Sequence, residues 1–207
     1  MREYLNLFEA KDVDGDVDLS DQNLTKIPEQ YGIAGGSFWC DSNQLTTLEG
    51  APEEVGRDFW CQTNQLITLE GGPKKVDGDF WCQRNRLTSL KGAPKKVGRD
   101  FLCNENQLNT LEGAPEEVGG SFWCQKNPLT SLKGTPKKVG KNFLCSENPD
   151  LSPWEMRYAL FCDIKDGFKS NNEEADALIN EFFKRARDGE EKQDIVVEYM
   201  ERLKKLS

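Results

Sequence analysis

The side chains best suited to chemistry in this sequence are cysteines, and six of them recur at a constant interval of 21 residues. They are Cys40, Cys61, Cys82, Cys103, Cys124 and Cys145. A thiolate can act as a nucleophile or a zinc ligand, but zinc ligands normally come in close pairs, and this spacing supplies single ones. The sequence also contains no histidine, the commonest general base and metal ligand. We therefore predict buried core thiols, and neither a metal site nor a cofactor.

No other combination of residues in the sequence assembles a recognisable active site. We find no phosphate-binding loop, and no nucleophile that could be paired with a base. We therefore predict no catalytic residues and a protein that is not an enzyme.

The cysteines are positioned by a repeat that reads F-x-C-x-x-N-x-L-x-x-L and continues as [E/K]-G-x-P-x-x-V. Phenylalanine precedes each cysteine by two residues, at Phe38, Phe59, Phe80, Phe101, Phe122 and Phe143. This alternation is typical of a short strand with one buried face, and the glycine and proline that follow are typical of a turn. One turn cannot bury its own apolar face, so this strict period predicts a solenoid of stacked turns.

The pattern resembles the leucine-rich repeat, L-x-L-x-x-N/C-x-L, with phenylalanine and cysteine in the two strand positions. The resemblance covers roughly residues 17 to 151, and it is closest to the short repeats of bacterial effector proteins and similar to cysteine-bearing repeats of large tailed phages. It implies an α/β repeat solenoid, right-handed, with one short parallel strand per repeat and an extended or polyproline-like return segment. Glycine replaces the first proline of the family's turn, so the family's curvature and twist are not carried over.

Three regions follow from where the repeat begins and ends. Residues 1–16 are predicted to form an N-terminal cap, 17–151 the leucine-rich-repeat solenoid of seven repeats, and 152–207 a helical C-terminal cap. The N-terminal cap is expected to contain an amphipathic helix with apolar residues Tyr4, Leu5, Leu7 and Phe8.

The C-terminal cap is predicted to contain three helices. The first begins at the capping box of Ser152, the second at Asn171 or Asn172, and the third near Glu190. Cys162 lies in this region. Bacterial effector ligases with similar repeats carry a catalytic C-x-D motif in a far larger appended domain. This region has neither the motif nor the size, so we assign Cys162 no catalytic role.

An asparagine follows each cysteine by three residues, at Asn43, Asn64, Asn85, Asn106, Asn127 and Asn148. In leucine-rich repeats this side chain turns inward and bonds backbone groups of its own and the adjacent turn. The resemblance therefore predicts a buried hydrogen-bond ladder. The glutamate and lysine blocks of the turns are predicted to be solvated, with attraction below about 1 kcal/mol per exposed pair.

The column between phenylalanine and cysteine is apolar, although strand alternation places it on the face opposite the core. It begins with Asp18, ends with Leu144, and contains between them Trp39, Trp60, Trp81, Leu102 and Trp123. In-register parallel strands would bring successive members to about 4.8 Å, which predicts one continuous exposed stripe. The polar rim beside this stripe is predicted to contain Asp58, Asp79, Asp100, Gln62, Gln83 and Arg84.

We predict that this stripe binds a protein partner with a basic and apolar surface, because tryptophan is strongly enriched among interface hot spots. The alternative is a structural or self-associating protein whose stripe is covered by another copy or by its own helices. A phage internal protein would be one example, since Leu7-Phe8-Glu9 resembles the L-x-E cleavage signal of such proteins. Ice or carbohydrate binding is a further alternative, suggested by a hydroxyl column of Thr47, Thr68, Ser89, Thr110 and Ser131.

The composition of the chain argues against two other classes of partner, nucleic acids and membranes. The net charge of −9 argues against nucleic-acid binding, which needs a basic face to neutralise phosphates. No apolar run approaches the length of a membrane span or a secretory signal. The sequence therefore predicts a cytoplasmic protein without a nucleic-acid or membrane partner, and leaves assembly into a homo-oligomer open.

Overall fold

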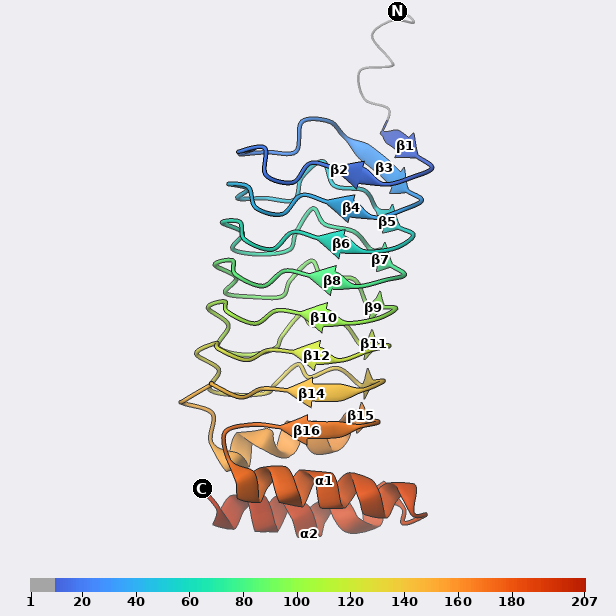
Figure 1. The fold of residues 1–207 in the computed structure, drawn as a ribbon. Helices are drawn as coiled ribbons and strands as arrows, with labels where there is room; N and C mark the ends of the chain where they lie inside the picture. Colours follow the sequence, from blue (N-terminus) through green and yellow to red (C-terminus); the bar gives the residue numbers. More distant parts are fainter. Residues whose placement is uncertain (1–9) are drawn as a thin grey trace, which may run out of the picture.

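In the computed structural model, which describes residues 10–207, the chain winds into a rod of stacked turns with helices at one end (Figure 1). Each turn contributes one short strand to each of two parallel eight-stranded sheets. Strand partners are 21 residues apart through the repeats, as between Phe59 and Phe80, so the repeat solenoid predicted from the sequence is confirmed. The helix predicted around Tyr4 and Phe8 lies outside the described residues.

The first sheet, called here the tryptophan sheet, contains the even-numbered strands. They are β2 (Val17–Asp18), β4 (Phe38–Trp39), β6 (Phe59–Trp60), β8 (Phe80–Trp81), β10 (Phe101–Leu102), β12 (Phe122–Trp123), β14 (Asn142–Leu144) and β16 (Gly167–Lys169). The second, the valine sheet, contains the odd-numbered strands. They are β1 (Lys11–Val13), β3 (Tyr31–Ala34), β5 (Glu54–Val55), β7 (Lys75–Val76), β9 (Lys96–Val97), β11 (Glu117–Val118), β13 (Lys138–Val139) and β15 (Asp163–Ile164).

The valine sheet corrects the prediction of one strand per repeat. The return segment after each proline is extended, as expected, but it also pairs with the same segment of the next turn. The backbone N–H of Lys74, for example, donates to the carbonyl of Glu53 at 2.8 Å. Because the register places each extended segment beside its own copy, its backbone groups are also paired across turns.

The core between the two sheets is built from the phenylalanine, cysteine, leucine and valine columns. Every phenylalanine from Phe38 to Phe143 is fully buried, and the rings of successive turns lie 5.1–5.8 Å apart between centroids. The six cysteines of the repeat are also buried. Identical side chains therefore stack on one another along the whole rod.

The asparagine ladder predicted from the resemblance is confirmed. Asn106 donates from Nδ2 to the carbonyl of Cys103 in its own turn and to that of Cys82 in the preceding turn, both at 3.1 Å. Its Oδ1 accepts the backbone N–H of Leu87 at 3.0 Å. Nδ2 also approaches the carbonyl of Asn104 at 3.3 Å. One buried side chain thus bonds four backbone groups, which ties each turn to its neighbour.

The two sheets continue beyond Leu151, where the sequence repeat ends. A 3₁₀-helix, η1 (Pro153–Phe161), follows in place of the first predicted α-helix, and the Ser152 hydroxyl accepts the N–H of Glu155 at 3.4 Å at its start. The chain then returns through β15 and β16, which add one strand to each sheet.

Ile164 and Phe168 explain why this extra turn fits. They keep the four-residue spacing of Val139 and Phe143 in the repeat before them. Val139 pairs with Ile164, and the rings of Phe143 and Phe168 stack at 5.5 Å. The C-terminal region therefore contributes an eighth turn before its helices begin.

The second and third predicted helices are confirmed as α1 (Glu173–Arg187) and α2 (Lys192–Lys205). The Asn172 side chain caps α1 by accepting the N–H of Ala175 at 2.8 Å. Gly189, with φ of 107°, makes the turn between the two helices. This conformation favours glycine, because other residues meet steric strain there.

Helix α1 packs against β16, the last strand of the tryptophan sheet, and reaches the residue that follows β15. The Asn180 side chain accepts the backbone N–H of Phe168 at 2.8 Å and donates to its carbonyl at 2.9 Å. Arg187 donates to the carbonyl of Lys165 at 3.1 Å. These side chains occupy backbone groups that an uncovered edge strand would offer to another chain.

Gly98 stands where two successive turns approach closely, because a Cβ added there would overlap the backbone carbonyl of Asp77. We expect Gly98→Ala to lower the free energy of unfolding by about 1–3 kcal/mol, since the turns must move apart to admit the methyl group. Urea denaturation followed by circular dichroism measures the loss. The matched control is Gly167→Ala, whose added Cβ would meet its nearest neighbours at 3.6 Å, an ordinary contact. Equal losses in the two variants would contradict this explanation.

Candidate binding surface

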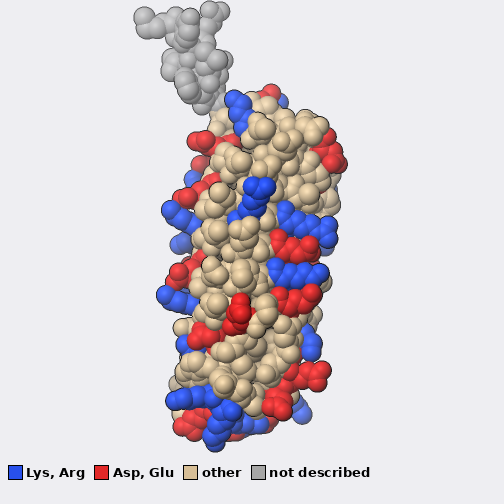
Figure 2. Space-filling view, turned by 90° about the vertical axis from the view of Figure 1, so that its left-hand side faces the viewer, with Lys and Arg blue, Asp and Glu red and all other residues tan. Residues whose placement is uncertain are grey.

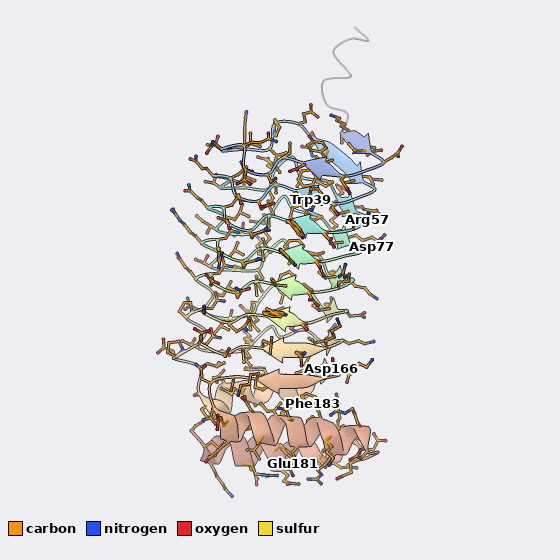
Figure 3. All side chains as sticks on the ribbon, in the orientation of Figure 1. Trp39, Arg57, Asp77, Asp166, Glu181 and Phe183 are labelled. Atoms are coloured by element: carbon orange, nitrogen blue, oxygen red, sulfur yellow. The ribbon has the colours of Figure 1, made fainter. Side chains whose placement is uncertain are left out.

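The tryptophan ribbon, formed by Trp39, Trp60, Trp81, Leu102 and Trp123, runs along the outer face of the tryptophan sheet. Figure 3 labels Trp39, which begins it. The rings of Trp60 and Trp81 stack with centroids 4.6 Å apart and planes 9° apart. Trp39 and Trp60 are 5.6 Å apart and tilted by 38°. Strand alternation produces this arrangement, because each ribbon residue lies between a buried phenylalanine and a buried cysteine.

The ribbon is half-buried, whereas the sequence predicted an exposed stripe. The difference arises because neighbouring indoles cover part of one another. The Nε1 atoms of all four ribbon tryptophans are shielded from solvent and have no hydrogen-bond partner in the described part of the chain. Since Nε1 is the only polar atom of an indole, the surface that remains exposed is entirely apolar.

The predicted amide rim lies beside the ribbon, two residues further along each strand. Gln62 and Gln83 are half-buried, and their side-chain oxygens are shielded without a partner among the described residues. Asn104 and Gln125 show the same feature in the following turns. A row of unpaired acceptors therefore runs parallel to the row of unpaired indole donors.

The predicted aspartate rim forms a second hydrogen-bond ladder. Oδ1 of Asp58 accepts the backbone N–H of Asp79 at 2.8 Å, and Oδ1 of Asp79 accepts that of Asp100 at 3.0 Å. Oδ1 of Asp100 continues the ladder to the N–H of Ser121 at 2.7 Å. The side chains of Asp58 and Asp79 retain only 23% and 13% exposure. These aspartates therefore stabilise the rod, and offer a partner only their second oxygens.

Arg99 was missed by the sequence analysis and bridges this aspartate ladder. Its guanidinium lies 3.5 Å from Asp79 and 3.9 Å from Asp58, so it contacts carboxylates of two turns. The sequence contains a signal for this arginine. The position two residues before the repeat phenylalanine is arginine in two alternate repeats, at Arg57 and Arg99. Part of the negative charge expected on the rim is thereby neutralised.

Arg84, the basic residue of the predicted rim, pairs with Glu105 of the next turn at 3.1 Å. Lys126 and Glu147 lie in the same column two turns further on, 3.9 Å apart. Arg84 also has a φ of 56°, the left-handed conformation that all members of this column share. The column marks a tight corner of the rod, and its charges alternate in sign from turn to turn.

The charged turns also alternate in sign, and Figure 2 shows acidic and basic side chains along both edges of a largely uncharged band. Lys91 lies 2.8 Å from Glu70, and Lys133 lies 2.7 Å from Glu112. All four side chains are more than half exposed. Such exposed pairs contribute at most about 1 kcal/mol each, so they fit the prediction of solvated surface.

The hydroxyl column that suggested ice or carbohydrate binding has a local structural use. Thr47 accepts the N–H of Glu49 at 3.2 Å, and Ser89 accepts that of Lys91 at 3.1 Å. These are side-chain turns of the kind that serine and threonine form readily. These hydroxyl oxygens therefore already accept a hydrogen bond from the backbone of their own turn.

The cysteine columns offer no reactive thiol. Burial raises the pKa of every repeat cysteine well above its usual range, and it raises the pKa of Cys162 to about 12. Because the thiolate is the nucleophile and the metal ligand, these thiols act as small apolar core groups. Among residues 10–207, no three potential metal ligands come together.

Comparison with known proteins assigns no family or function to this chain. No family model, curated protein or solved structure matches the chain. The function proposed below therefore rests on the residues of the chain itself. One further property bears on it: none of the helices in residues 10–207 has the length and apolar character needed to cross a bilayer.

Proposed function

We propose that this protein is a non-catalytic binding module whose partner protein contacts the tryptophan ribbon. The observation that carries the proposal is the apolar ribbon on the outer face of a regular sheet. In the described part of the chain, η1, α1 and α2 pack on one another and against β16 at the end of the rod, away from the ribbon (Figure 1). This arrangement favours a partner over the chain's own helices as the element that covers the ribbon.

The unpaired indole nitrogens support a binding role. Each buried donor without a partner costs about 1–3 kcal/mol. Leu102 occupies the same column without such a donor, so the fold accepts a residue that avoids this cost. Four positions nevertheless carry tryptophan and its unpaired N–H. A binding role explains this, because tryptophan contributes more binding energy at protein interfaces than other residues do.

The rim defines the chemistry of the partner. The second carboxylate oxygens of Asp58, Asp79 and Asp100 can accept hydrogen bonds from lysine or arginine, while the ribbon requires an apolar surface. We therefore propose a partner protein that presents both kinds of group. The net charge of −9 supports the exclusion of nucleic acid, and we propose a cytoplasmic protein without a membrane partner.

We infer that the repeat is a variant of the leucine-rich repeat, similar in pattern to the short repeats of bacterial effectors and large tailed phages. The asparagine ladder supports this kinship, since it makes the hydrogen bonds that the resemblance implies. The valine sheet is the main departure from the expected return segment.

A structural role, such as that of a phage internal protein, is the second candidate. It is favoured by the regular spacing of the ribbon, because two copies could pack ribbon against ribbon with matching intervals of 4.6–5.6 Å. In that case the partner of the ribbon would be another copy of this chain.

The test is a variant in which Trp60 and Trp81 are both replaced by alanine. We expect binding of the partner to weaken at least about 100-fold, because two central hot-spot residues are removed. Partners captured from a lysate of the source cells would be identified, purified and measured against both proteins by calorimetry. Light scattering would show whether the captured partner is the chain itself.

The matched control replaces Ile33 and Ile67, which are exposed apolar residues outside the ribbon, by alanine. This variant should bind the partner as the unmodified protein does, and both variants should keep their circular dichroism spectra. A folded ribbon variant that binds the same partner with unchanged affinity would refute the proposal.

A further inference from the structure

A second apolar surface lies at the end of the rod, where η1 and α2 run side by side in opposite directions. The N–H of Trp154, at the start of η1, donates to the side chain of Ser207 at 2.8 Å, just beyond the end of α2. Lys192, at the start of α2, donates to the carbonyl of Cys162 at 3.4 Å, just beyond the end of η1. The two elements therefore form one antiparallel pair.

This pair carries the two most exposed large apolar side chains among residues 10–207. Phe161 is 63% exposed and Val197 is 60% exposed. Val196 and Met200 beside them are half-buried. A hollow of about 260 Å³ lies further along α2, lined by Trp154, Val197, Met200, Glu201 and Lys204. Phe161 itself borders a second hollow of about 310 Å³, which Val196 and Lys192 also line. Each half of the surface thus contains an apolar depression, and the exposed Phe161 ring lies at the edge of one of them.

The charges along α2 are distributed unevenly. Around its start the acidic Glu190, Glu191 and Asp194 outnumber Lys192, and at its end the basic Arg202, Lys204 and Lys205 outnumber Glu201. Glu190 and Arg202 already form ion pairs within the chain, so Glu191 and Lys204 contribute most of this difference in charge. Two copies of α2 packed in opposite directions would bring the acidic start of each against the basic end of the other. Packed in the same direction, they would bring like charges together.

We propose that this surface binds a second copy of the chain through a two-fold axis near Val197. Under such an axis the first half of α2 in one copy faces the second half in the other. Phe161 of one copy then enters the hollow between Trp154 and Met200 of its partner, and the contact is made twice by symmetry. The dimer does not involve the tryptophan ribbon and is independent of the function proposed for it.

The primary experiment is sedimentation equilibrium of the full chain from 1 to 200 µM. The unmodified protein is expected to reach twice the monomer mass within this range. Val197→Asp should raise the dissociation constant at least about 30-fold, because the interface would bury a charge without a partner. Ile67→Asp, at a position 55% exposed on the rod, is the control and should leave the dimer intact.

Two further variants test the geometry. All seven native cysteines are buried, so Val197→Cys would supply a single exposed thiol, and a short bis-maleimide should link two copies only if Val197 lies near the axis. Ile67→Cys is the control for random linking. Lys204→Glu should weaken the dimer, and adding Glu191→Lys to it should restore the affinity if acidic starts face basic ends.

A chain that remains monomeric at 200 µM overturns the proposal. It is equally overturned by a dimer that Val197→Asp leaves unchanged and that the Trp60 and Trp81 alanine variant abolishes, since the ribbon would then be the interface. A dimer lost in Val197→Asp but never linked through Val197→Cys would overturn the two-fold geometry.

Discussion

Replacing Asn106 by leucine is expected to lower the free energy of unfolding by about 3 kcal/mol or more. Leucine is similar in size but cannot bond the carbonyls of Cys82 and Cys103 or the N–H of Leu87, which the asparagine holds at 3.0–3.1 Å. Each backbone group left unpaired in the core costs about 1–3 kcal/mol. Urea denaturation, followed by both circular dichroism and tryptophan fluorescence, measures the change.

Gln107 provides the matched control for this substitution, because it is the next residue, carries the same amide group and is exposed. Gln107→Leu should change the free energy of unfolding by less than about 0.5 kcal/mol, as surface substitutions usually do. If Asn106→Leu were as stable as Gln107→Leu, the ladder would not contribute to stability and the asparagine column would need another explanation.

Phe101→Ala should destabilise the rod by about 3–5 kcal/mol, the usual cost of removing a buried aromatic ring. Phe101 is fully buried, and its ring lies 5.2 Å from that of Phe80 and 5.4 Å from that of Phe122. Its removal would leave an apolar cavity in the middle of a continuous stack. Thermal unfolding of the variant against the unmodified protein gives the effect.

The cavity itself supplies a specific check, because an apolar cavity of this kind stays dry and can bind benzene. Benzene should raise the melting temperature of Phe101→Ala and leave that of the unmodified protein unchanged. Leu102→Ala, at the neighbouring half-buried position, should cost less than Phe101→Ala. Equal losses at the two positions would mean that strand alternation does not assign the faces as described.

The columns of the repeat were predictable because each one recurs at the same position of every turn. Cys82 and Asn106 could be placed in the core from spacing and from the leucine-rich-repeat pattern alone. The valine sheet was not predicted, because Val76 gives the same signal in an extended segment whether or not that segment pairs. Pairing depends on how closely the return paths of two turns approach, which depends on small residues such as Gly98, where an added Cβ would overlap the carbonyl of Asp77.

The sequence places the ribbon correctly on the outer face of the sheet. It does not reveal the contacts that the polar residues beside the ribbon make with neighbouring turns. Asp79 gives the same sequence signal whether its carboxylate points to solvent or accepts a backbone N–H of the next turn. Arg84 and Glu105 are each polar surface residues in the sequence, and only the register of turns brings them into contact. Exposure of the indoles was overestimated for the same reason, because Trp60 and Trp81 cover each other only when stacked.

The predicted end of the solenoid, at Leu151, comes one turn too early, because the prediction counted only turns at the strict 21-residue interval. Phe168 comes 25 residues after Phe143 instead of 21, and the nine-residue η1 lies within this longer segment. The shorter spacing between Ile164 and Phe168 carried the missing signal, since it equals that between valine and phenylalanine in every complete repeat.

The eighth turn has a consequence for how proteins of this design can change in length. Because Ile164 and Phe168 pair with the turn before them at the valine and phenylalanine positions of a repeat, residues 152–207 can serve as a transferable terminus. Whole repeats could be duplicated or lost ahead of it in steps of 21 residues, each altering the rod by about 4.8 Å, with no compensating change at the end. The rod would then act as a molecular ruler, in which gene duplication sets the distance between the first turn and the helices.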